Sequence, residues 1–513
     1  MSQFNLLDEK WIPVKFPNGT RDELGLSDVL LRSDEIAVIE DPSPLVMAAL
    51  HRLLLAVLYR ALAGPTDIDQ ARALFRVGLP EGPVAAYLER WRDRFWLFDD
   101  KHPFFQVPDY EPKKVKGEQQ WKSWPTIAAE HNADNSKVLF DHVDITGAGS
   151  VSSSRVARWL IACQSFALGG GKSDFQYSRS APSATAVMVM PLGATLQDTL
   201  IMSLVPENRD VLQSDRPVWE REPDALASLQ RGDERAITGN VDLYTWRSRS
   251  IKLRANGDGR TVDGLAFASG VECSSKDFID PMLAYRIDEK RGKLPVQFRD
   301  RGLWRDFDSL LPDDSRLAPR VIEHAAALSR STRERLPRSV IVLGQANKKA
   351  KIEYWRNERF ALPSALAGDR SIRREIKQLL TDAESTNTAL WTACASFASD
   401  LLSRGERDPA KKDVRAFVEQ MAVMSRYWST LESRFPGVLT EYSLDSDSEV
   451  IRREWLTSVR GALGTTWNQF RASVSTGDAW TIRAITKADR PVSRQLRKLN
   501  DQISELTPEE QRA

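Results

Sequence analysis

The feature that most constrains the fold of this chain is a change in the spacing of its apolar residues near Asp369. From there to the C-terminus, apolar side chains recur every three or four residues, beginning with Ile372, Ile376 and Leu379. That spacing is typical of helices that bury one face and expose the other. Only short connections separate the periodic stretches, at residues 405–408, 436–445 and 475–478. Short loops between amphipathic helices predict an antiparallel four-helix bundle.

The first two thirds of the chain instead mix strand and helix patterns. Asn18-Gly19 is a hairpin signal, residues 339–343 have the composition of a strand, and residues 154–166 that of a helix. A length of 513 residues allows two to four domains. The sequence therefore predicts an α+β protein: a large mixed α/β N-terminal domain, residues 1–365, is followed by a C-terminal antiparallel four-helix bundle, residues 366–513.

The most apolar stretch of the chain, residues 45–63, predicts a buried helix. His51, Arg52 and Arg60 interrupt it, and charged side chains are costly inside a bilayer, so a membrane span is disfavoured. The N-terminus is polar and lacks the pattern of a signal peptide. The three cysteines are scattered, which fits a reducing compartment. We therefore expect a cytoplasmic protein with no membrane contact.

Composition and motifs narrow the function classes that are open to the chain. The 72 Lys and Arg residues nearly balance the 71 Asp and Glu residues, for a net charge of +1. A protein that coats nucleic acid by itself is usually far more basic, so any such contact is expected from local patches or inside a larger assembly. The five histidines are dispersed, and no zinc-protease motif, nucleophile elbow or paired metal ligands occur. These features predict a binding protein, not an enzyme, with no metal and no cofactor.

Three consecutive glycines, Gly169, Gly170 and Gly171, are the most unusual local feature of the N-terminal region. Glycine loses more backbone entropy on folding than any other residue, so such a run indicates positive φ angles or a close approach to the backbone. The apolar stretch 156–168 precedes the run, and Lys172 follows it. The pattern predicts a ledge of backbone N–H donors with a cation at its edge, which suits a phosphate or the edge of a base pair.

Two other interpretations of the glycine run stay open. Gly171-Lys172-Ser173 matches the second half of a nucleotide-binding P-loop, which would indicate a nucleotide-dependent enzyme. The first glycine of that motif would fall at residue 166, which is Phe166, and a bulky side chain there would block the turn around the phosphates. The remaining interpretation is a flexible linker of glycines that binds no ligand.

Three basic stretches are candidates for contact with nucleic acid. Residues 245–253 alternate apolar and basic side chains, which predicts a strand with one cationic face. Residues 339–355 predict a hairpin with a basic tip. The last helix carries cations at three- and four-residue steps, namely Arg483, Lys487, Arg490, Arg494 and Arg497. A solvated face fits the strand and the helical stripe as well, so both interpretations of those two stretches stay open.

An ordered set of short stretches runs along the whole chain. They are Asn5-Leu6-Leu7 with Trp11-Ile12-Pro13-Val14, His102-Pro103-Phe104, Phe140 before a Gly/Ser-rich loop, the triple glycine, the strand at Tyr244-Thr245-Trp246, the basic hairpin and the terminal helices. In this order they resemble the CasA family, the large subunit of the type I-E CRISPR surveillance complex Cascade. Each stretch alone is weakly specific, and the ordered set carries the resemblance.

The resemblance implies a site for the protospacer-adjacent motif (PAM), which the family reads at the minor groove with a glycine loop, a lysine finger and a hairpin wedge. The positions that match these elements or adjoin them are Phe140, Gly169, Gly170, Gly171, Lys172, Lys276, Asn347, Lys348 and Lys349. Lys276 is the only lysine in residues 253–289, and Phe140 matches an aromatic residue at the start of a loop implicated in DNA engagement. Some relatives have an Asn-Gln tip on the wedge, where this chain has lysines. Relatives with a middle cysteine cluster differ from this chain, so no zinc is expected.

The resemblance also implies a function and a set of partners. CasA lies beside the 5′ end of the guide RNA, inspects duplex DNA for the PAM, starts strand separation and R-loop formation, and presents the target to a recruited helicase-nuclease. The implied partners are the backbone, guide-end and small subunits of Cascade, the CRISPR guide RNA, double-stranded target DNA and the helicase-nuclease. A purely structural scaffold subunit of the same complex is the alternative.

Overall fold

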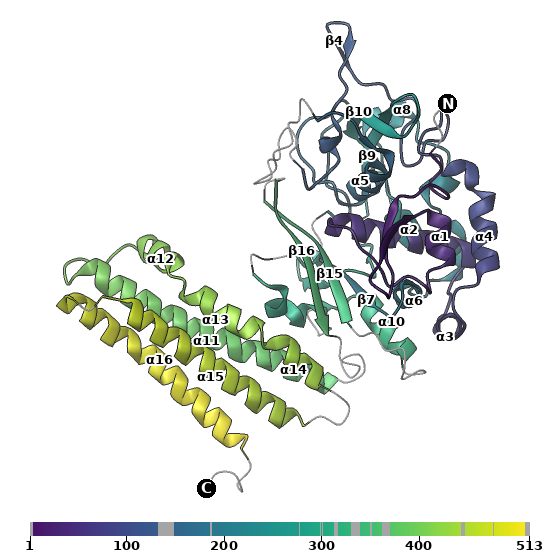
Figure 1. Cartoon of the computed structure of the whole chain (residues 1–513). Coiled ribbons are helices and arrows are strands. Elements are labelled where there is room, and N and C mark those ends of the chain that lie inside the picture. The colour runs from purple at the N-terminus through teal and green to yellow at the C-terminus, as the bar shows by residue number, and fades with distance from the viewer. Residues whose placement is uncertain are drawn as a thin grey trace. The chain divides into compact units, whose positions relative to one another are not determined.

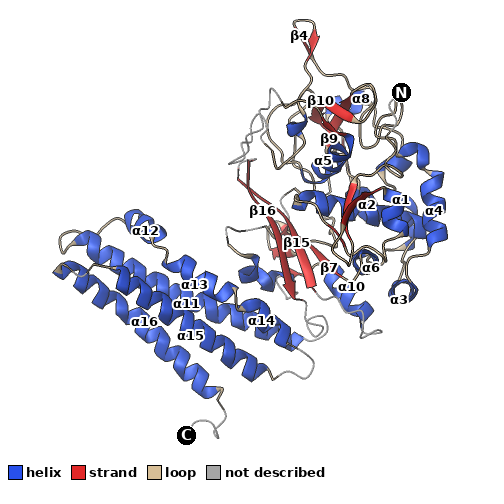
Figure 2. Ribbon diagram, in the orientation of Figure 1, coloured by secondary structure: helices blue, strands red, loops and turns tan. Residues whose placement is uncertain are grey.

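The computed structural model describes residues 4–131, 148–184, 187–275, 277–297, 299, 301–311, 316–329, 339–348, 351–361, 370–442, 447–475 and 477–507. The chain divides into two compact units. The first comprises residues 1–301 and 309–359, and the second comprises residues 302–308 and 360–513. Strands and helices mix in the first unit and helices dominate the second (Figures 1 and 2), which confirms the predicted α+β class.

The central helix of the first unit is α2 (Pro44–Leu62), whose residues 44–59 are all buried. Ser43 caps it by accepting the N–H of Val46. Among the described helices, α2 alone is long and apolar enough to cross a bilayer. It is instead enclosed by protein, as the sequence predicts for a buried helix. Its packing partners include α4 (Glu81–Arg90), α5 (Ser153–Phe166), α6 (Leu196–Ser203), α9 (Asn240–Tyr244) and β15 (Ser339–Lys348).

The strands of the first unit form several small sheets of two or three strands. Three sheets matter below, and their strand orders are β2-β1-β3, β6-β10-β9 and β16-β15-β7. The strands are β1 (Ile12–Lys15), β2 (Arg21–Leu24), β3 (Val38–Ile39), β4 (Lys114–Val115), β5 (Glu118–Gln119), β6 (Val151–Ser152), β7 (Met188–Leu192), β8 (Glu234–Arg235), β9 (Arg249–Ala255), β10 (Thr261–Ser269), β11 (Glu272–Cys273), β12 (Tyr285–Asp288), β13 (Gly292–Pro295), β14 (Arg316–Leu317), β15 and β16 (Lys351–Ala361). The remaining helices are α1 (Leu26–Leu31), α3 (Ile68–Val77), α7 (Arg209–Ser214), α8 (Leu226–Arg231) and α10 (Arg320–Ser329).

The second unit is a bundle of amphipathic helices. In the described part of the chain its long helices are α11 (Arg370–Ser403), α15 (Ser448–Ser473) and α16 (Ala479–Glu505), and its shorter ones are α12 (Lys411–Gln420), α13 (Val423–Glu432) and α14 (Phe435–Glu441). Helix α11 packs against α12, α15 and α16, and α13 packs against α15. The second predicted helix is therefore broken near Met421. No Gly or Pro lies between residues 411 and 434, and Phe417, Met421 and Met424 continue the apolar spacing across the break.

A short aromatic segment, residues 302–308, belongs to the helical unit although it lies far from it in sequence. The ring of Trp304 contacts those of Trp428, Phe435 and Trp455, with centroids 5.1–6.3 Å apart. The Arg305 guanidinium lies 3.6 Å from the centre of the Trp428 ring. Burial of such aromatic surface is worth several kcal/mol, so this segment is part of the core of the bundle.

Candidate nucleic-acid interface

The glycine run begins three residues after the end of α5 and forms one arm of a hairpin-like loop, residues 167–180, which we call the glycine loop. The N–H of Gly170 donates to the carbonyl of Ser178 at 2.9 Å, and the N–H of Ser178 donates to that of Gly171 at 3.3 Å. Lys172 forms a β-bridge with Tyr177 across the same loop. The loop is thus hydrogen-bonded along its length, which contradicts the flexible-linker interpretation.

All three positions of the run have a steric reason for glycine. A Cβ on Gly169 would lie 2.5 Å from the backbone nitrogen of Ser180, so the two arms can approach only because this side chain is absent. Gly170 and Gly171 have φ angles of 148° and 74°, which a residue with a side chain adopts only under strain. The space beside Gly171 is open, so its backbone angle alone requires glycine there. The predicted need for positive φ and close approach is met within one loop.

The predicted ledge of N–H donors is smaller than the sequence suggested. The N–H of Gly169 donates to the Ser180 hydroxyl at 2.8 Å, and that of Gly170 is used within the loop, so two donors are unavailable to a ligand. The exposed residues of the outgoing arm are Gly170, Gly171 and Lys172, and those of the returning arm are Gln176, Tyr177, Arg179 and Ser180. Tyr177, the bridge partner of Lys172 across the loop, is 68% exposed.

The loop is not a P-loop, because the order of its elements is the opposite of that motif. A P-loop leads from a strand into a helix, whose N-terminus holds the phosphates. Here the glycines follow the C-terminal end of α5, and Phe166 is the buried last residue of that helix. No helix begins within residues 167–184. The nucleotide-binding interpretation is therefore wrong.

The base of the glycine loop is fastened to the strand that leads to the predicted wedge. Nε2 of Gln345, on β15, donates to the carbonyls of Phe166 and Ala184, each at 2.8 Å. Asn347 is half-buried two residues further along the same strand. Lys348 ends β15, its side chain lies outside the described part, and Lys349 lies outside it altogether. One side chain thus joins the two ends of the loop segment to the hairpin strand.

Arg52 connects the turn that follows the predicted lysine finger to the base of the glycine loop. The Arg52 guanidinium, on α2, is 1% exposed; it forms an ion pair with Asp280 and donates to the Ser183 hydroxyl at 2.7 Å. It also lies 5.8 Å from the centre of the Phe166 ring, at the end of α5. Lys276, four residues before Asp280, lies outside the described residues, and so does Phe140.

The predicted cationic strand face at residues 245–253 is wrong. Strand β9 begins only at Arg249, and the side chains of Arg247 and Arg249 are buried, with exposures of 8% and 2%. Backbone carbonyls accept hydrogen bonds from both guanidinium groups, which explains how two such charges can be buried inside the unit. Lys252 is partly exposed, and it pairs with Glu111 at 2.6 Å. The alternation reflects buried polar contacts rather than a surface.

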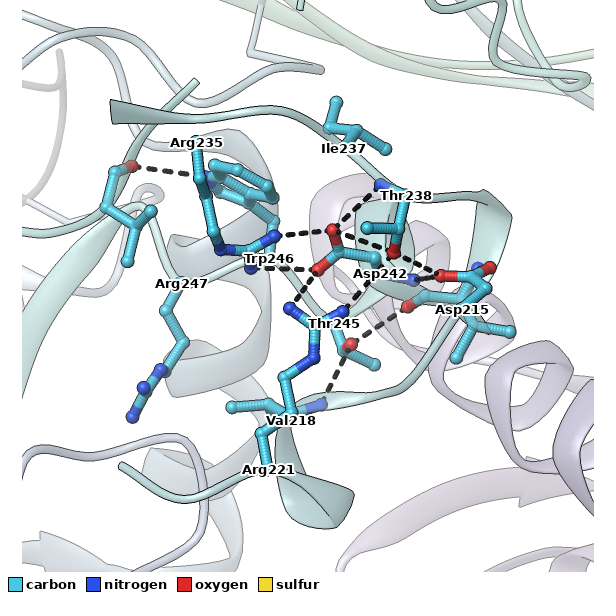
Figure 3. Close-up of polar contacts among 12 residues, drawn as sticks. Asp215, Val218, Arg221, Arg235, Ile237, Thr238, Asp242, Thr245, Trp246 and Arg247 are labelled. Atoms are coloured by element: carbon cyan, nitrogen blue, oxygen red, sulfur yellow. Dashed lines mark hydrogen bonds and ion pairs between the residues drawn. The ribbon is translucent and has the colours of Figure 1, made fainter. Parts of the chain in front are cut away.

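The expected strand at residues 244–246 is also wrong, because a carboxylate caps a helix there (Figure 3). Asp215 accepts the N–H groups of Val241 and Asp242 at 2.7 and 2.9 Å, so residues 240–244 form the short helix α9. Burial raises the pKa of Asp215, while these N–H groups act in the opposite direction. A Cβ on Gly239 would lie 2.3 Å from Oδ2 of Asp215, so that residue leaves room for the cap.

A second carboxylate fixes the segment between α9 and β9 (Figure 3). Asp242 accepts two hydrogen bonds from Arg235, at 2.5 and 2.8 Å, and pairs with Arg221 at 3.1 Å. The Arg235 guanidinium lies 4.1 Å from the centre of the Trp246 ring. Bidentate pairs and stacked guanidinium groups are geometrically specific, so this network holds the residues just before β9 in one arrangement.

An apolar cavity of about 180 Å³ opens beside the glycine loop. Its lining includes Ile127, Trp159, Phe166, Arg249 and Gln345. Among the described residues, no three His, Cys, Asp or Glu side chains gather as metal ligands. Burial lowers the pKa of His51 and of His324 to about 4, so both imidazoles are neutral near pH 7.

In the second unit the predicted basic stripe of α16 divides into two parts. Arg483 and Lys487 both bond to the carboxylate of Asp400 on α11 at 2.8 Å, and Arg483 first, with Lys487, holds the pKa of that carboxyl well below its usual range. The exposed cations further along include Arg490, Arg494 and Arg497, none of which forms an ion pair within the described part. Only this second part of the stripe is a free cationic surface.

Comparison with known proteins identifies the family. The model of the CRISPR-associated protein Cse1 family matches residues 5–465 of the chain. The chain belongs to the Cse1 (CasA) family. The CRISPR-associated protein CasA/Cse1 of Thermus thermophilus is 32% identical over 98% of this chain and 99% of its own length. The crystal structure of Thermus thermophilus CasA matches with a TM-score of 0.85 at 31% identity, covering 97% of this chain and 100% of that one.

A more distant match extends the fold comparison to an assembled complex. A chain of a CRISPR RNA-guided surveillance complex superposes with a TM-score of 0.75, covering 96% of this chain and 100% of that one. At 19% identity this likeness shows the fold alone. Membership of the Cse1 family confirms the resemblance and the α+β architecture that the sequence predicts. The sequence signals missed Arg52, Arg249 and Gln345, which lie between segments far apart in the chain.

Proposed function

We propose that this Cse1-family chain is a non-catalytic subunit of a cytoplasmic RNA-guided DNA-surveillance complex and recognises the PAM in double-stranded DNA through the minor groove. It would then help to start strand separation and R-loop formation and position the recruited helicase-nuclease. Its proposed partners are the other subunits of the complex, the guide RNA and the target duplex. Gly169, Gly170, Gly171, Lys172, Lys276, Asn347, Lys348, Lys349 and Phe140 are the proposed DNA-binding residues.

The observation that carries the proposal is the exposed tip of the glycine loop. Gly170 and Gly171 present bare backbone beside Lys172, so a duplex edge could approach closely with a cation alongside. The minor groove distinguishes mainly A·T from G·C pairs, and a backbone edge with one lysine reads it leniently. Because the N–H groups of Gly169 and Gly170 are already bonded within the loop, close approach and the Lys172 charge carry more of the recognition than a row of N–H donors would.

The nearness of the hairpin strand to the glycine loop supports a role in strand separation. Gln345 joins β15 to both ends of the loop segment, so a duplex held at the loop would lie near the Asn347 end of that strand. Opening a base-pair step costs about 1.4 kcal/mol of stacking. Contacts worth a few kcal/mol at the loop are therefore enough to offset the opening of one or two steps. Because the net charge of the chain is only +1, most of the electrostatic attraction for the DNA phosphates would come from other subunits.

The test is duplex binding by the reconstituted complex on targets that differ only in the PAM. We expect Gly171→Val to reduce the preference for the PAM duplex by about tenfold or more. A valine in the left-handed region is strained by roughly 1–2 kcal/mol, and its side chain would block the approach of the duplex. Gly19→Val is the matched control: Gly19 also has positive φ and open space around it, but sits on the β1–β2 hairpin. Equal preference in both variants would refute the role of the loop.

A scaffold role is the second candidate, and exposed apolar side chains on the helical unit favour it. Trp391, Leu402, Trp480 and Ile482 are 37–51% exposed on α11 and α16. Large exposed apolar residues often mark protein-protein contacts. If complex assembled without this chain still distinguished PAM from non-PAM duplex, the scaffold role would stand and PAM recognition would be refuted.

A further inference from the structure

Arg249 connects the two arms of the glycine loop at its neck. Its Nη2 donates to the carbonyl of Leu168, directly before Gly169, at 2.7 Å. Its Nη1 donates to the carbonyl of Arg179, on the returning arm, at 2.9 Å. A third bond runs from Nη1 to the carbonyl of Ser248 at 2.7 Å. One planar guanidinium thus spans the neck, and no other hydrogen bond reaches the Leu168 or Arg179 carbonyl among the described contacts.

The backbone of Arg249 is itself held in place by hydrogen bonds. Gln164, on α5, accepts the N–H of Arg249 at 2.9 Å and donates to its carbonyl at the same distance. The hydroxyl of Ser248 donates to the carbonyl of Gln164 at 2.6 Å. The backbone of Arg249 is therefore fixed to α5, the helix that leads into the loop, so the side chain acts from a rigid base.

The charge of Arg249 is unusual because no carboxylate within the described residues pairs with it. The side chain is 2% exposed, and burial lowers the pKa of its guanidinium. Burying a charge is costly unless strong hydrogen bonds satisfy it, and bonds to a charged donor are about twice as strong as neutral ones. The carbonyls of Leu168, Arg179 and Ser248 provide that compensation. Two of the three belong to the glycine loop, so loop and cation stabilise each other.

We infer that Arg249 is the positioning residue of the glycine loop: it sets the width of the loop neck and so holds Gly170, Gly171 and Lys172 in the geometry that reads the PAM. The inference rests on the proposed function for its last step. The close approach of Gly169 to Ser180 leaves no spare room in the neck, so loss of the brace would let the arms move relative to each other. Arg249 itself, being buried, would touch no DNA.

The experiment compares Arg249→Met with Arg247→Met in the full chain and in the reconstituted complex. Arg247 is a close match: it is buried two residues earlier, but it donates to the Gln106 carbonyl at 3.2 Å and pairs with Asp224, away from the loop. Arg249→Lys is the conservative variant, which keeps the charge and loses the fork that reaches both arms. If Arg249→Met fails to fold, the lysine variant decides the question by itself.

The first readout is hydrogen exchange of the glycine-loop peptide, residues 167–180, in the free chain. Losing the charged hydrogen bonds should speed exchange by about tenfold, because the two arms of the loop are then no longer joined at the neck. Arg247→Met should leave this peptide unchanged. Exchange in the Arg249 variants equal to that of the parent chain would overturn the inference whatever the loop binds.

The second readout is the affinity ratio for PAM and non-PAM duplexes, with a pre-opened bubble target as reference. Arg249→Met should lower the ratio about tenfold while bubble binding and assembly stay unchanged, and Arg249→Lys should fall between it and the parent chain. If Gly171→Val lowers the ratio but Arg249→Met does not, the positioning role is refuted. If neither Gly171→Val nor Arg249→Met changes the ratio while Arg249→Met speeds exchange, Arg249 does position the loop and the proposed PAM function is refuted.

Discussion

The two units of the chain use positive charge in different ways. In the first unit, Arg52, Arg247 and Arg249 are buried and bond to carboxylates or carbonyls inside the unit. On α16 of the helical unit, Arg494 and Arg497 are exposed. The first group holds segments of the unit together from inside, while the second forms part of the surface itself. A count of basic residues along the sequence would treat both groups alike.

The difference matters because buried and exposed charges respond differently to mutation and to salt. A buried guanidinium that loses its partner leaves an uncompensated charge in a medium of low polarity, and salt hardly screens it. An exposed one loses little, and its attraction for a polyanion falls as salt rises. Stability measurements should therefore be sensitive to the arginines of the first unit, and salt-dependent binding to those of the second.

The largest effect is expected at the buried pair between Arg52 and Asp280. Arg52→Met should destabilise the first unit by about 3–5 kcal/mol, because Asp280 would remain charged and unpaired. Thermal and denaturant unfolding of the free chain would measure the change. Lys10→Met is the control, since Lys10 pairs with Asp22 in an exposed bridge at 2.9 Å and should lose less than about 1 kcal/mol.

Replacing both partners gives a second check on that pair. Arg52→Met with Asp280→Leu should recover part of the loss, because no charge is then stranded, although Asp280 also accepts the N–H of Met282 at 2.9 Å. If Arg52→Met alone were as stable as Lys10→Met, the Arg52 guanidinium would not be needed to hold the glycine loop, the turn at Asp280 and α2 together.

A smaller effect, one that depends on pH, is expected in the helical unit. Arg483 and Lys487 lower the pKa of Asp400 in the folded state relative to the unfolded value of about 3.9. The stabilisation is therefore complete above that unfolded pKa and is lost as pH falls towards the folded pKa. Unfolding of Asp400→Asn should depend less on pH below about 4. Asp501→Asn, an exposed site on α16, should follow the parent curve, and a parent curve that is flat in acid would contradict the pairing.

The elements of the fold were predictable where a short stretch carries its own pattern. Helix α5 was expected at 154–166 and is found at Ser153–Phe166, since its caps and apolar spacing are local. The Gly19 hairpin and the strand at 339–343 follow for the same reason. The break between α12 and α13 was not predictable, because the apolar spacing continues through it without a Gly or Pro.

The site was predictable in its exposed part and not in its supports. The glycine run predicted positive φ angles and a close approach of the backbone, because both depend on the residue type itself. The role of Arg249 depends on carbonyls 70 and 81 residues away, and that of Gln345 on carbonyls 161 and 179 residues away. A basic residue in an alternating strand looks the same in sequence whether it faces water or a buried loop neck.

The smallest effect is expected on the exposed half of the α16 stripe. Reversing Arg490, Arg494 and Arg497 to Glu should weaken binding of a pre-opened bubble target by the reconstituted complex, if these cations hold the displaced single strand. Each lost phosphate contact would lower the slope of log affinity against log salt by about 0.7, so the triple variant should lose roughly two. Arg483→Gln is the contrasting variant, because its charge is engaged by Asp400, and it should leave the slope unchanged. A triple variant with the parent slope would make the whole stripe a solvated face, and the contrast between the units would then lie in stability alone.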